Sequence, residues 1–358
     1  MPHDNRLLTA SDIVSALIRI ATAFLLVALL ASPLAAQTLR LAVYHTGLGR
    51  NGPGLLLRDI RRGAEDVVAV TSAIAQLRPD VLLLLDIDHD RDLRSLSALR
   101  DAIAQAGWPL PHAHAPPPNT GLATGRDLDG DGRLGEGDDA QGWGRFRGAG
   151  GMALLSRYPV AGTTDHSAFL WRDLPDARTP RVDGRLFPAP EIYEIQRLST
   201  TGHWEVTLET PETPLTIWAW HAGPPVFGGP YGRNRARNAD ETAFWLWRLS
   251  TAPPTGPFVL MGNANLDPGA GDGERAVIRA LLAHPALQDP APRAPFDPGG
   301  PDSAATALWP EPEGPGALRV DYLLPASGLR VRDGGLTRVP GSVHALVWAD
   351  LQWPPQEP

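Results

Sequence analysis

The chain of 358 residues contains no cysteine. This absence excludes disulfide bonds, a catalytic thiol and zinc sites built on cysteine. Three common motifs are also missing, namely the Gly-x-Ser-x-Gly nucleophile elbow, the phosphate-binding P-loop and the His-Glu-x-x-His metalloprotease motif. The formal net charge of −8 argues against broad, charge-driven binding to nucleic acid. Hydrophobic residues make up 43% of the chain, which is enough for a sizeable core.

A hydrophobic run near the N-terminus has the features of an export signal. Arg19 precedes an apolar run at 20–31, Pro33 ends it, and small residues lie around Ala36. The run is short for a membrane span, which needs about 20 apolar residues. We expect a signal peptide over 1–36 and no stable membrane anchor, so that the protein works in the periplasm or outside the cell. An uncleaved anchor is the alternative.

Apolar patterning predicts alternating strands and helices along the rest of the chain. The first part is expected to run strand, helix, strand, helix. Strands are predicted at 39–45, 80–85, 150–160, 195–200, 203–208, 215–220, 258–261, 318–325 and 345–351. Helices are predicted at 59–77, 93–106, 233–249 and 274–282. The length allows either two domains or one large α/β or sandwich domain.

Several of the predicted strands end in polar residues. The apolar run 258–261 is followed by Gly262, Asn263 and Asn265, and the run 80–85 is followed by Asp86 and Asp88. Because α/β folds place their chemistry at the carboxyl ends of strands, these ends are candidate site positions. An Asn-rich turn after a core strand is the simpler interpretation of residues 262–268 taken alone.

The segment 127–138 has the spacing of a twelve-residue calcium loop. Acidic residues stand at loop positions 1, 3, 5 and 12, glycine at 6 and an apolar residue at 8. A hard cation requires several oxygen ligands, and the glycine permits the sharp turn that directs them inward. We expect Ca²⁺ bound by Asp127, Asp129, Asp131 and Asp138 to order this insertion. The alternative is a solvated acidic loop.

Four motifs, taken in order, resemble the endonuclease/exonuclease/phosphatase superfamily. They are Gly-Met-Ala-Leu-Leu-Ser-Arg-Tyr-Pro-Val at 151–160, Gly-Asn-Ala-Asn-Leu-Asp-Pro at 262–268, Arg-Val-Asp-Tyr-Leu-Leu-Pro at 319–325 and Ser-Val-His-Ala-Leu-Val at 342–347. The resemblance covers residues 39–351. It implies one domain over 37–358, folded as a four-layer α/β sandwich with two mixed sheets face to face and helices outside. It also implies a monomeric, metal-dependent phosphoester hydrolase, a phosphodiesterase, nuclease or phosphatase, that uses Mg²⁺ or Mn²⁺.

The resemblance also assigns roles to individual positions. It places a divalent cation at His45, Asp86 and Asp88, and phosphate contacts at Arg197 and His221. The remaining catalytic positions that it implies are Asn263, Asn265, Asp321 and His344.

This chain departs from the family pattern at several of these positions. Asn263 replaces the aspartate that activates water, and an amide cannot accept a proton near neutral pH. Val343 replaces an aspartate beside His344, which suggests that this histidine has lost its orienting carboxylate. His45 replaces a metal-site asparagine and favours a softer metal.

Three classes of function therefore stay open. The first is an active hydrolase with a rearranged site, and the second is a catalytically impaired family member that acts as a calcium-stabilised binding module. A calcium-dependent adhesion module is the third. A shared cleft containing His45, Asp86, His221, Asn265 and His344 would favour the hydrolase lineage over adhesion. The substrate class, whether nucleic acid, lipid head group or sugar phosphate, is not defined by the sequence.

Overall fold

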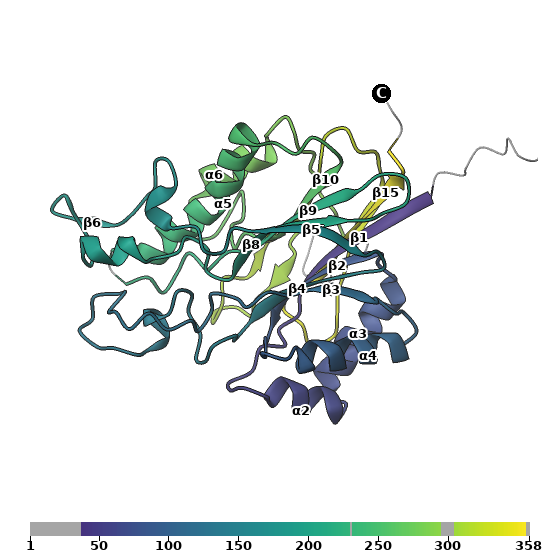
Figure 1. Cartoon of the computed structure of the whole chain (residues 1–358), viewed down its shortest axis with the longest axis horizontal. Coiled ribbons are helices and arrows are strands. Elements are labelled where there is room, and N and C mark those ends of the chain that lie inside the picture. The colour runs from purple at the N-terminus through teal and green to yellow at the C-terminus, as the bar shows by residue number, and fades with distance from the viewer. Residues whose placement is uncertain (1–36, 230, 295–303, 356–358) are drawn as a thin grey trace, which may run out of the picture. The chain divides into compact units, whose positions relative to one another are not determined.

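A computed structural model describes residues 37–229, 231–294 and 304–355 (Figure 1). The expected signal peptide at 1–36 lies outside the described residues. From Thr38 onward the described residues belong to one compact unit. In that part of the chain, no helix is long and apolar enough to cross a membrane.

Two mixed β-sheets carry most of the described strands. The larger sheet has the order β14-β15-β1-β2-β4-β3 and is formed by Val331–Thr337, Leu346–Trp353, Gln37–His45, Val81–Ile87, Gly151–Ser156 and His112–His114. The smaller sheet has the order β13-β10-β9-β8-β5 and is formed by Asp321–Pro325, Phe258–Asn263, Leu215–His221, Gly202–Leu208 and Val160–Asp165. The β1–β2 pair of the larger sheet and the β9–β10 pair of the smaller sheet are parallel, whereas the neighbouring pairs β2–β4 and β8–β9 are antiparallel. Two short hairpins, β6–β7 (Arg181–Val182 and Arg185–Leu186) and β11–β12 (Ala307–Leu308 and Ala317–Leu318), lie outside these sheets.

Helices cover the outer face of each sheet (Figure 1). Helices α2 (Leu55–Arg61), α3 (Glu65–Leu77) and α4 (Arg94–Gln105) share a hydrophobic cluster with β1 and β2. Helices α5 (Arg233–Thr251) and α6 (Arg275–Leu282) share another with β9 and β10. Short 3-10 turns are found at Gly137–Asp139, Trp171–Asp173 and Pro190–Glu194.

The core between the sheets explains why the strands alternate inward and outward. Val43 and Leu83 of the larger sheet share a buried cluster with Ile217 and Val259 of the smaller one. Their neighbours in sequence, such as Leu82 and Leu260, face the helices instead. Strands buried on both faces read as continuous apolar runs, which is the pattern seen at 81–85. The predicted four-layer α/β sandwich is therefore confirmed.

Two sequence predictions of local structure are wrong. The single helix expected at 59–77 is two helices, because the chain breaks at Gly63, whose φ of +67° lies in the left-handed region. The strand expected at 195–200 is instead a bent segment with one isolated bridge between Leu170 and Arg197. The carbonyl groups of Arg197, Leu198 and Ser199 accept hydrogen bonds from the Arg237 side chain rather than from a neighbouring strand.

Candidate active site

Three candidate residues stand side by side at one end of the smaller sheet. Asn263, the last residue of β10, pairs with His221 at the end of β9 and with Asp321 at the start of β13. His45 ends β1 in the other sheet, opposite Leu85. The parallel pairs bring these ends to one edge of the sandwich, as the strand-end pattern in the sequence predicts.

A chain of hydrogen bonds links four of the predicted residues. The Asn263 side-chain amide donates to Asp321 Oδ1 at 2.7 Å, and Asp321 Oδ2 lies 2.8 Å from His344 Nδ1. The backbone N–H of Asn265 donates to Asn263 Oδ1 at 2.8 Å. The expectation that His344 lacks an orienting carboxylate is wrong, because Asp321 supplies one. Val343, in contrast, is 37% exposed and takes no part in this chain.

Three histidines are in direct contact. The ring of His45 stacks on that of His344 with centroids 4.0 Å apart, and its edge meets His221 at 5.1 Å. His221 and His344 are both buried. His221 and Asn265 are also neighbours, because the Asn265 side-chain amide donates to the carbonyl of Ala222. The structure thus brings together side chains separated by about 300 positions in the sequence.

Burial and mutual repulsion keep two of these histidines neutral. Burial, followed by the neighbouring His344, lowers the pKa of His45 to about 4. Burial, followed by His45, lowers the pKa of His221 well below its ordinary value. Burial alone would raise the pKa of Asp321, but the charge and hydrogen bond of His344 outweigh it, so the pKa is lowered. The cluster therefore holds one buried carboxylate beside imidazoles with free lone pairs.

Asp86 occupies a β-bulge in strand β2, and its side chain lines the main cavity of the protein. The register of the β2–β4 pair shifts between Leu85 and Ile87, and Asp86 between them has φ of +54°. A Cβ atom added to Gly49 or Gly150 would lie 2.5 or 2.7 Å from Asp86 Oδ1. Glycine at both positions therefore leaves the room that this carboxylate occupies.

Asp88 and Arg197 have different surroundings from Asp86. The two carboxylate oxygens of Asp88 accept hydrogen bonds from the backbone N–H groups of Arg50 and Gly150. Burial raises the pKa of Asp88 to about 6. The Arg197 guanidinium donates to the side chain of Asn119. Neither residue lines the main cavity, so both are placed to hold loops around the site.

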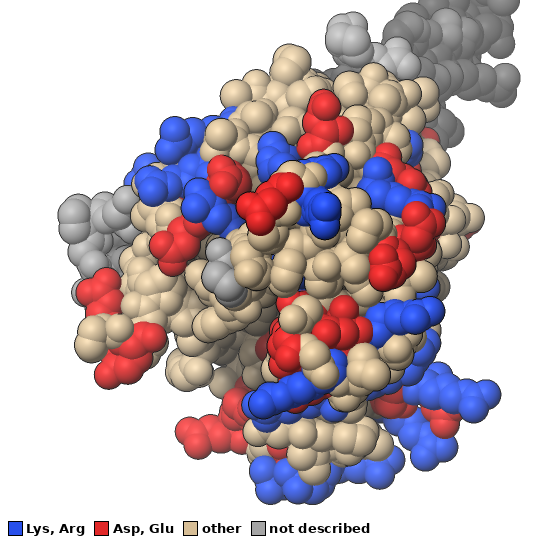
Figure 2. All heavy atoms as spheres, turned by 90° about the vertical axis from the view of Figure 1, so that its left-hand side faces the viewer, with Lys and Arg blue, Asp and Glu red and all other residues tan. Residues whose placement is uncertain are grey.

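The main cavity has a volume of about 640 Å³, and three of the predicted residues line it: Asp86, Asp138 and His221. Four arginines line it: Arg50, Arg145, Arg233 and Arg237. Sequence analysis missed all four. Arg233 and Arg237 are one helical turn apart on α5, so the i,i+4 spacing of two arginines at a helix start was the available signal. On the face shown in Figure 2, acidic and basic side chains are interspersed rather than gathered by sign.

Glu241 is a second feature that sequence analysis missed. Its side chain is fully buried and contributes to the cavity wall. One carboxylate oxygen accepts from the backbone N–H of Thr200, and the other accepts from that of Gly223 and from the Thr200 hydroxyl. Burial raises the pKa of Glu241 to about 7. Glu241 therefore fastens the loop after His221 to helix α5 and to the segment around Thr200.

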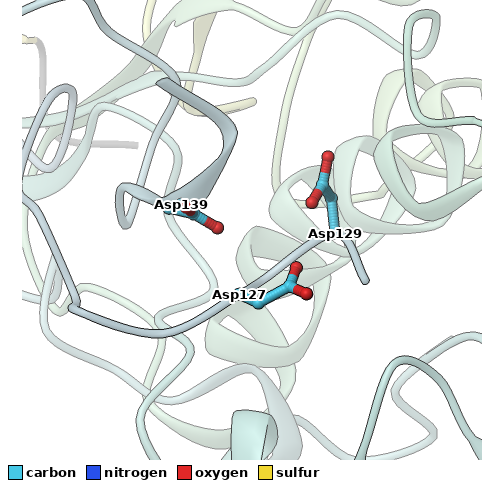
Figure 3. A group of neighbouring side chains, drawn as sticks. All are labelled: Asp127, Asp129 and Asp139. Carbon is cyan, nitrogen blue, oxygen red and sulfur yellow. The ribbon is translucent and has the colours of Figure 1, made fainter. Parts of the chain in front are cut away.

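The acidic loop forms a cluster that differs in part from the predicted one. Asp127, Asp129 and Asp139 each place an oxygen within 4.8 Å of the others, and Figure 3 shows Asp139 facing the other two from a neighbouring turn. The side chain of Asp131 instead caps the backbone of Arg133, and Asp138 lines the main cavity. Because of the 3-10 turn at Gly137–Asp139, the thirteenth loop residue, Asp139, joins the cluster in place of the twelfth, Asp138.

Comparison with known proteins places the chain in a family. The family model described as "Endonuclease/Exonuclease/phosphatase family" matches residues 40–349, and the chain belongs to this family. No curated protein matches the sequence.

Two solved structures illustrate the likeness in fold. An endonuclease/exonuclease/phosphatase from Beutenbergia cavernae DSM 12333 is 18% identical with a TM-score of 0.56, covering 88% of this chain and 72% of that one. A family protein from Leptotrichia buccalis C-1013-b is 12% identical with a TM-score of 0.51, covering 88% of this chain and all of the other. At these sequence identities, the likeness concerns the fold alone.

Proposed function

We propose that the protein is an exported, metal-dependent phosphoester hydrolase with a rearranged active site. The observation that carries the proposal is the contact of His45 with His221 and His344. His45 and His221 end strands of opposite sheets, His344 precedes β15, and Asp86 and His221 open on one cavity. This convergence is the arrangement expected of a hydrolase lineage rather than of an adhesion surface. Family membership provides the reaction class.

The donor groups fit a divalent cation that is completed by water and substrate. Asp86 offers a carboxylate in a recess kept open by Gly49 and Gly150. Within the described chain, the buried Nδ1 atoms of His45 and His221 have no hydrogen-bond partner. Mg²⁺ uses one or two carboxylates plus substrate phosphate, and Mn²⁺ likewise prefers oxygen ligands, so the Asp86 carboxylate suits either ion. The imidazole donors add affinity for later transition metals. A bound cation would polarise a phosphoryl oxygen as a Lewis acid.

The residues of the chain itself would then position the substrate and move the proton. The ionised Asp321 holds the Nδ1 proton of His344, which leaves Nε2 with a lone pair that can accept a proton from water. Neutral His221 donates one hydrogen bond to a phosphoryl oxygen. Asn263 cannot act as the base, because its amide is already committed to Asp321.

The test is a screen of phosphodiesters and phosphomonoesters with Mg²⁺, Mn²⁺ and Ca²⁺. His221→Ala and His344→Ala should each remove the activity, whereas His112→Ala on the edge strand β3 should not. Activity that is indifferent to His221 and His344 would contradict the assignment.

A second candidate function is a binding module without turnover. The observation in its favour is that Asn263, at the position of the water-activating aspartate, is fully buried and bonded at both ends of its side chain. Absence of turnover for every phosphoester and metal, combined with binding of phosphate compounds in the cavity, would support this candidate.

Ca²⁺ in the acidic loop is part of the same proposal. Three carboxylates that approach one another repel unless a cation joins them, and a ligand that binds only the folded state raises stability. Calcium should raise the melting temperature (Tm), and Asp129→Ala should abolish most of that rise. Asp138→Ala, outside the cluster, is the matched control. If Ca²⁺ leaves the Tm of the wild type unchanged, calcium binding is contradicted and the segment is a solvated acidic loop.

Export and a monomeric state complete the proposal. Cleavage near Ala36 predicts that protein from its host begins near Gln37, which N-terminal sequencing measures. An intact Met1 on cytoplasmic protein would contradict export. Light scattering of the purified protein should give the mass of one chain.

A further inference from the structure

Two aromatic side chains on the cavity wall are largely exposed. Trp143 is 55% exposed and Phe227 is 86% exposed, although both line the cavity that His221 and Asp86 reach. The rings come from separate loops, one after the acidic segment and one after β9. Burying such rings in the core would stabilise the fold, so their exposure beside a candidate active site suggests contact with a ligand.

The backbone that presents Trp143 is held firmly on both sides. The N–H of Gly142 donates to the carbonyl of Asn119, and its own carbonyl accepts from Gly121. A Cβ atom on Gly142 would lie 1.9 Å from the carbonyl oxygen of Thr200, so this close approach requires glycine. The backbone that carries the Trp143 ring is thus fixed before any ligand arrives, which reduces the entropy lost on binding.

Phe227 is also presented in a fixed and unfavourable conformation. Its φ of +66° lies in the left-handed region, which is rare for a bulky residue. The flanking loop is anchored to α5, because the Asn234 side chain donates to the carbonyl of Val226. A Cβ atom on Gly228 would lie 2.4 Å from the backbone nitrogen of Asn234. Strain of this kind persists where the surrounding structure enforces it, and it concentrates at ligand sites.

A cation lies beside the Trp143 ring. The Arg145 guanidinium lies 5.9 Å from the Trp143 ring centroid and bonds to the side chain of Asn51. The cavity volume of about 640 Å³ falls within the range of roughly 300–1,000 Å³ found for small-molecule sites. An aromatic surface, an arginine and the candidate catalytic residues therefore share one space of small-molecule size.

We propose that Trp143 and Phe227 form a subsite for the planar aromatic group of a small phosphoester whose phosphate is held near His221. This inference rests on the proposed hydrolase function and adds the class of substrate. A planar π-system matches two exposed rings, and Arg145 complements the negative charge of the phosphate.

Isothermal titration with two phosphonates tests the subsite without requiring turnover. Phenylphosphonate and methylphosphonate share a head group and differ in the ring, and neither is a phosphoester. In the presence of Mn²⁺ and at a pH where both are dianions, phenylphosphonate should bind about tenfold more tightly. Trp143→Ala and Phe227→Ala should each remove most of this preference and leave methylphosphonate binding unchanged.

Two further variants separate recognition from folding. Trp143→Phe should keep most of the preference, and Leu134→Ala, an exposed apolar position outside the cavity, should keep all of it. Equal binding of the two phosphonates, no binding of phenylphosphonate, or a preference that survives both alanine variants would overturn the proposal. A ring preference without hydrolysis of any phosphoester would refute the hydrolase assignment alone, whereas hydrolysis without a ring preference would refute the subsite alone.

Discussion

Replacing Asn263 by aspartate is the most informative single change in the buried hydrogen-bond chain. Asn263 and Asp321 are at most 1% exposed, and the amide nitrogen of one lies 2.7 Å from a carboxylate oxygen of the other. Asn263→Asp exchanges that donor for a second carboxylate oxygen. The variant loses a hydrogen bond to a charged group and places two carboxylates in contact, where both cannot be ionised.

The magnitude follows from these two losses. A hydrogen bond to a charged group contributes about 1.5–3 kcal/mol, and the repulsion adds to it, so we expect Asn263→Asp to destabilise the fold by about 3 kcal/mol at pH 8. For a chain of this size the Tm should fall by about 5 °C. One carboxyl of the pair has a folded-state pKa raised above its unfolded value. The penalty is therefore absent below the unfolded pKa of about 3.9 and grows as the pH rises.

Thermal unfolding from pH 5 to pH 8 measures this effect. The difference in Tm between wild type and Asn263→Asp should widen with pH, whereas Asn263→Ala, which removes the donor without adding charge, should show a pH-independent difference. Mn²⁺ should recover part of the loss in Asn263→Asp, because a cation relieves the repulsion between the carboxylates. An Asn263→Asp variant with wild-type Tm at pH 8 would show that the Asn263–Asp321 hydrogen bond is not formed.

Three further results are expected. Gly49→Ala should sharply reduce metal-dependent activity, because the added Cβ would displace the Asp86 carboxylate. Gly52→Ala is the control, because its Cβ would make only an ordinary contact. Equal effects of the two changes would contradict the role of Asp86. Glu241→Gln should change the pH dependence of stability. Between pH 4.5 and 7 the wild type loses on the order of 3 kcal/mol, because the carboxyl ionises in the unfolded chain while the buried one stays protonated. The variant should not show this loss, so parallel curves would refute the raised pKa. With Mn²⁺ bound, Asn263→Asp should raise phosphodiesterase activity, since general-base assistance contributes roughly 10²–10⁴-fold; robust wild-type turnover that this change lowers would mean the amide is part of a working site.

The sequence predicts the sheets well because both faces of the central strands are buried. Runs such as 81–85 stay apolar at every position, and polar residues begin where the strand reaches the edge of the sandwich. Helix boundaries are harder to predict from the sequence. The apolar spacing continues across Gly63, and the break between α2 and α3 depends on one left-handed backbone angle. The segment 195–200 alternates like a strand, but its partners are side chains from α5.

The candidate site is only partly visible in the sequence. The ends of the predicted strands locate His45, His221 and Asn263, because each strand stops where its apolar pattern stops. The pairing of His344 with Asp321 depends on a contact across 23 residues, and a reading based on the neighbouring Val343 misses it. Trp143 and Phe227 lie in loops whose course is set by tertiary contacts, so local pattern carries no signal for them.

Hydrolysis of bis(p-nitrophenyl) phosphate in the presence of Mn²⁺ distinguishes an active phosphoester hydrolase from an inactive binding module. We expect measurable turnover by the wild type, loss of that turnover in His221→Ala and in His344→Ala, and retention in His112→Ala, with all four proteins showing comparable melting curves. Turnover that persists in both His221→Ala and His344→Ala would contradict the proposed active site, because the contact among His45, His221 and His344 would then have no part in the chemistry.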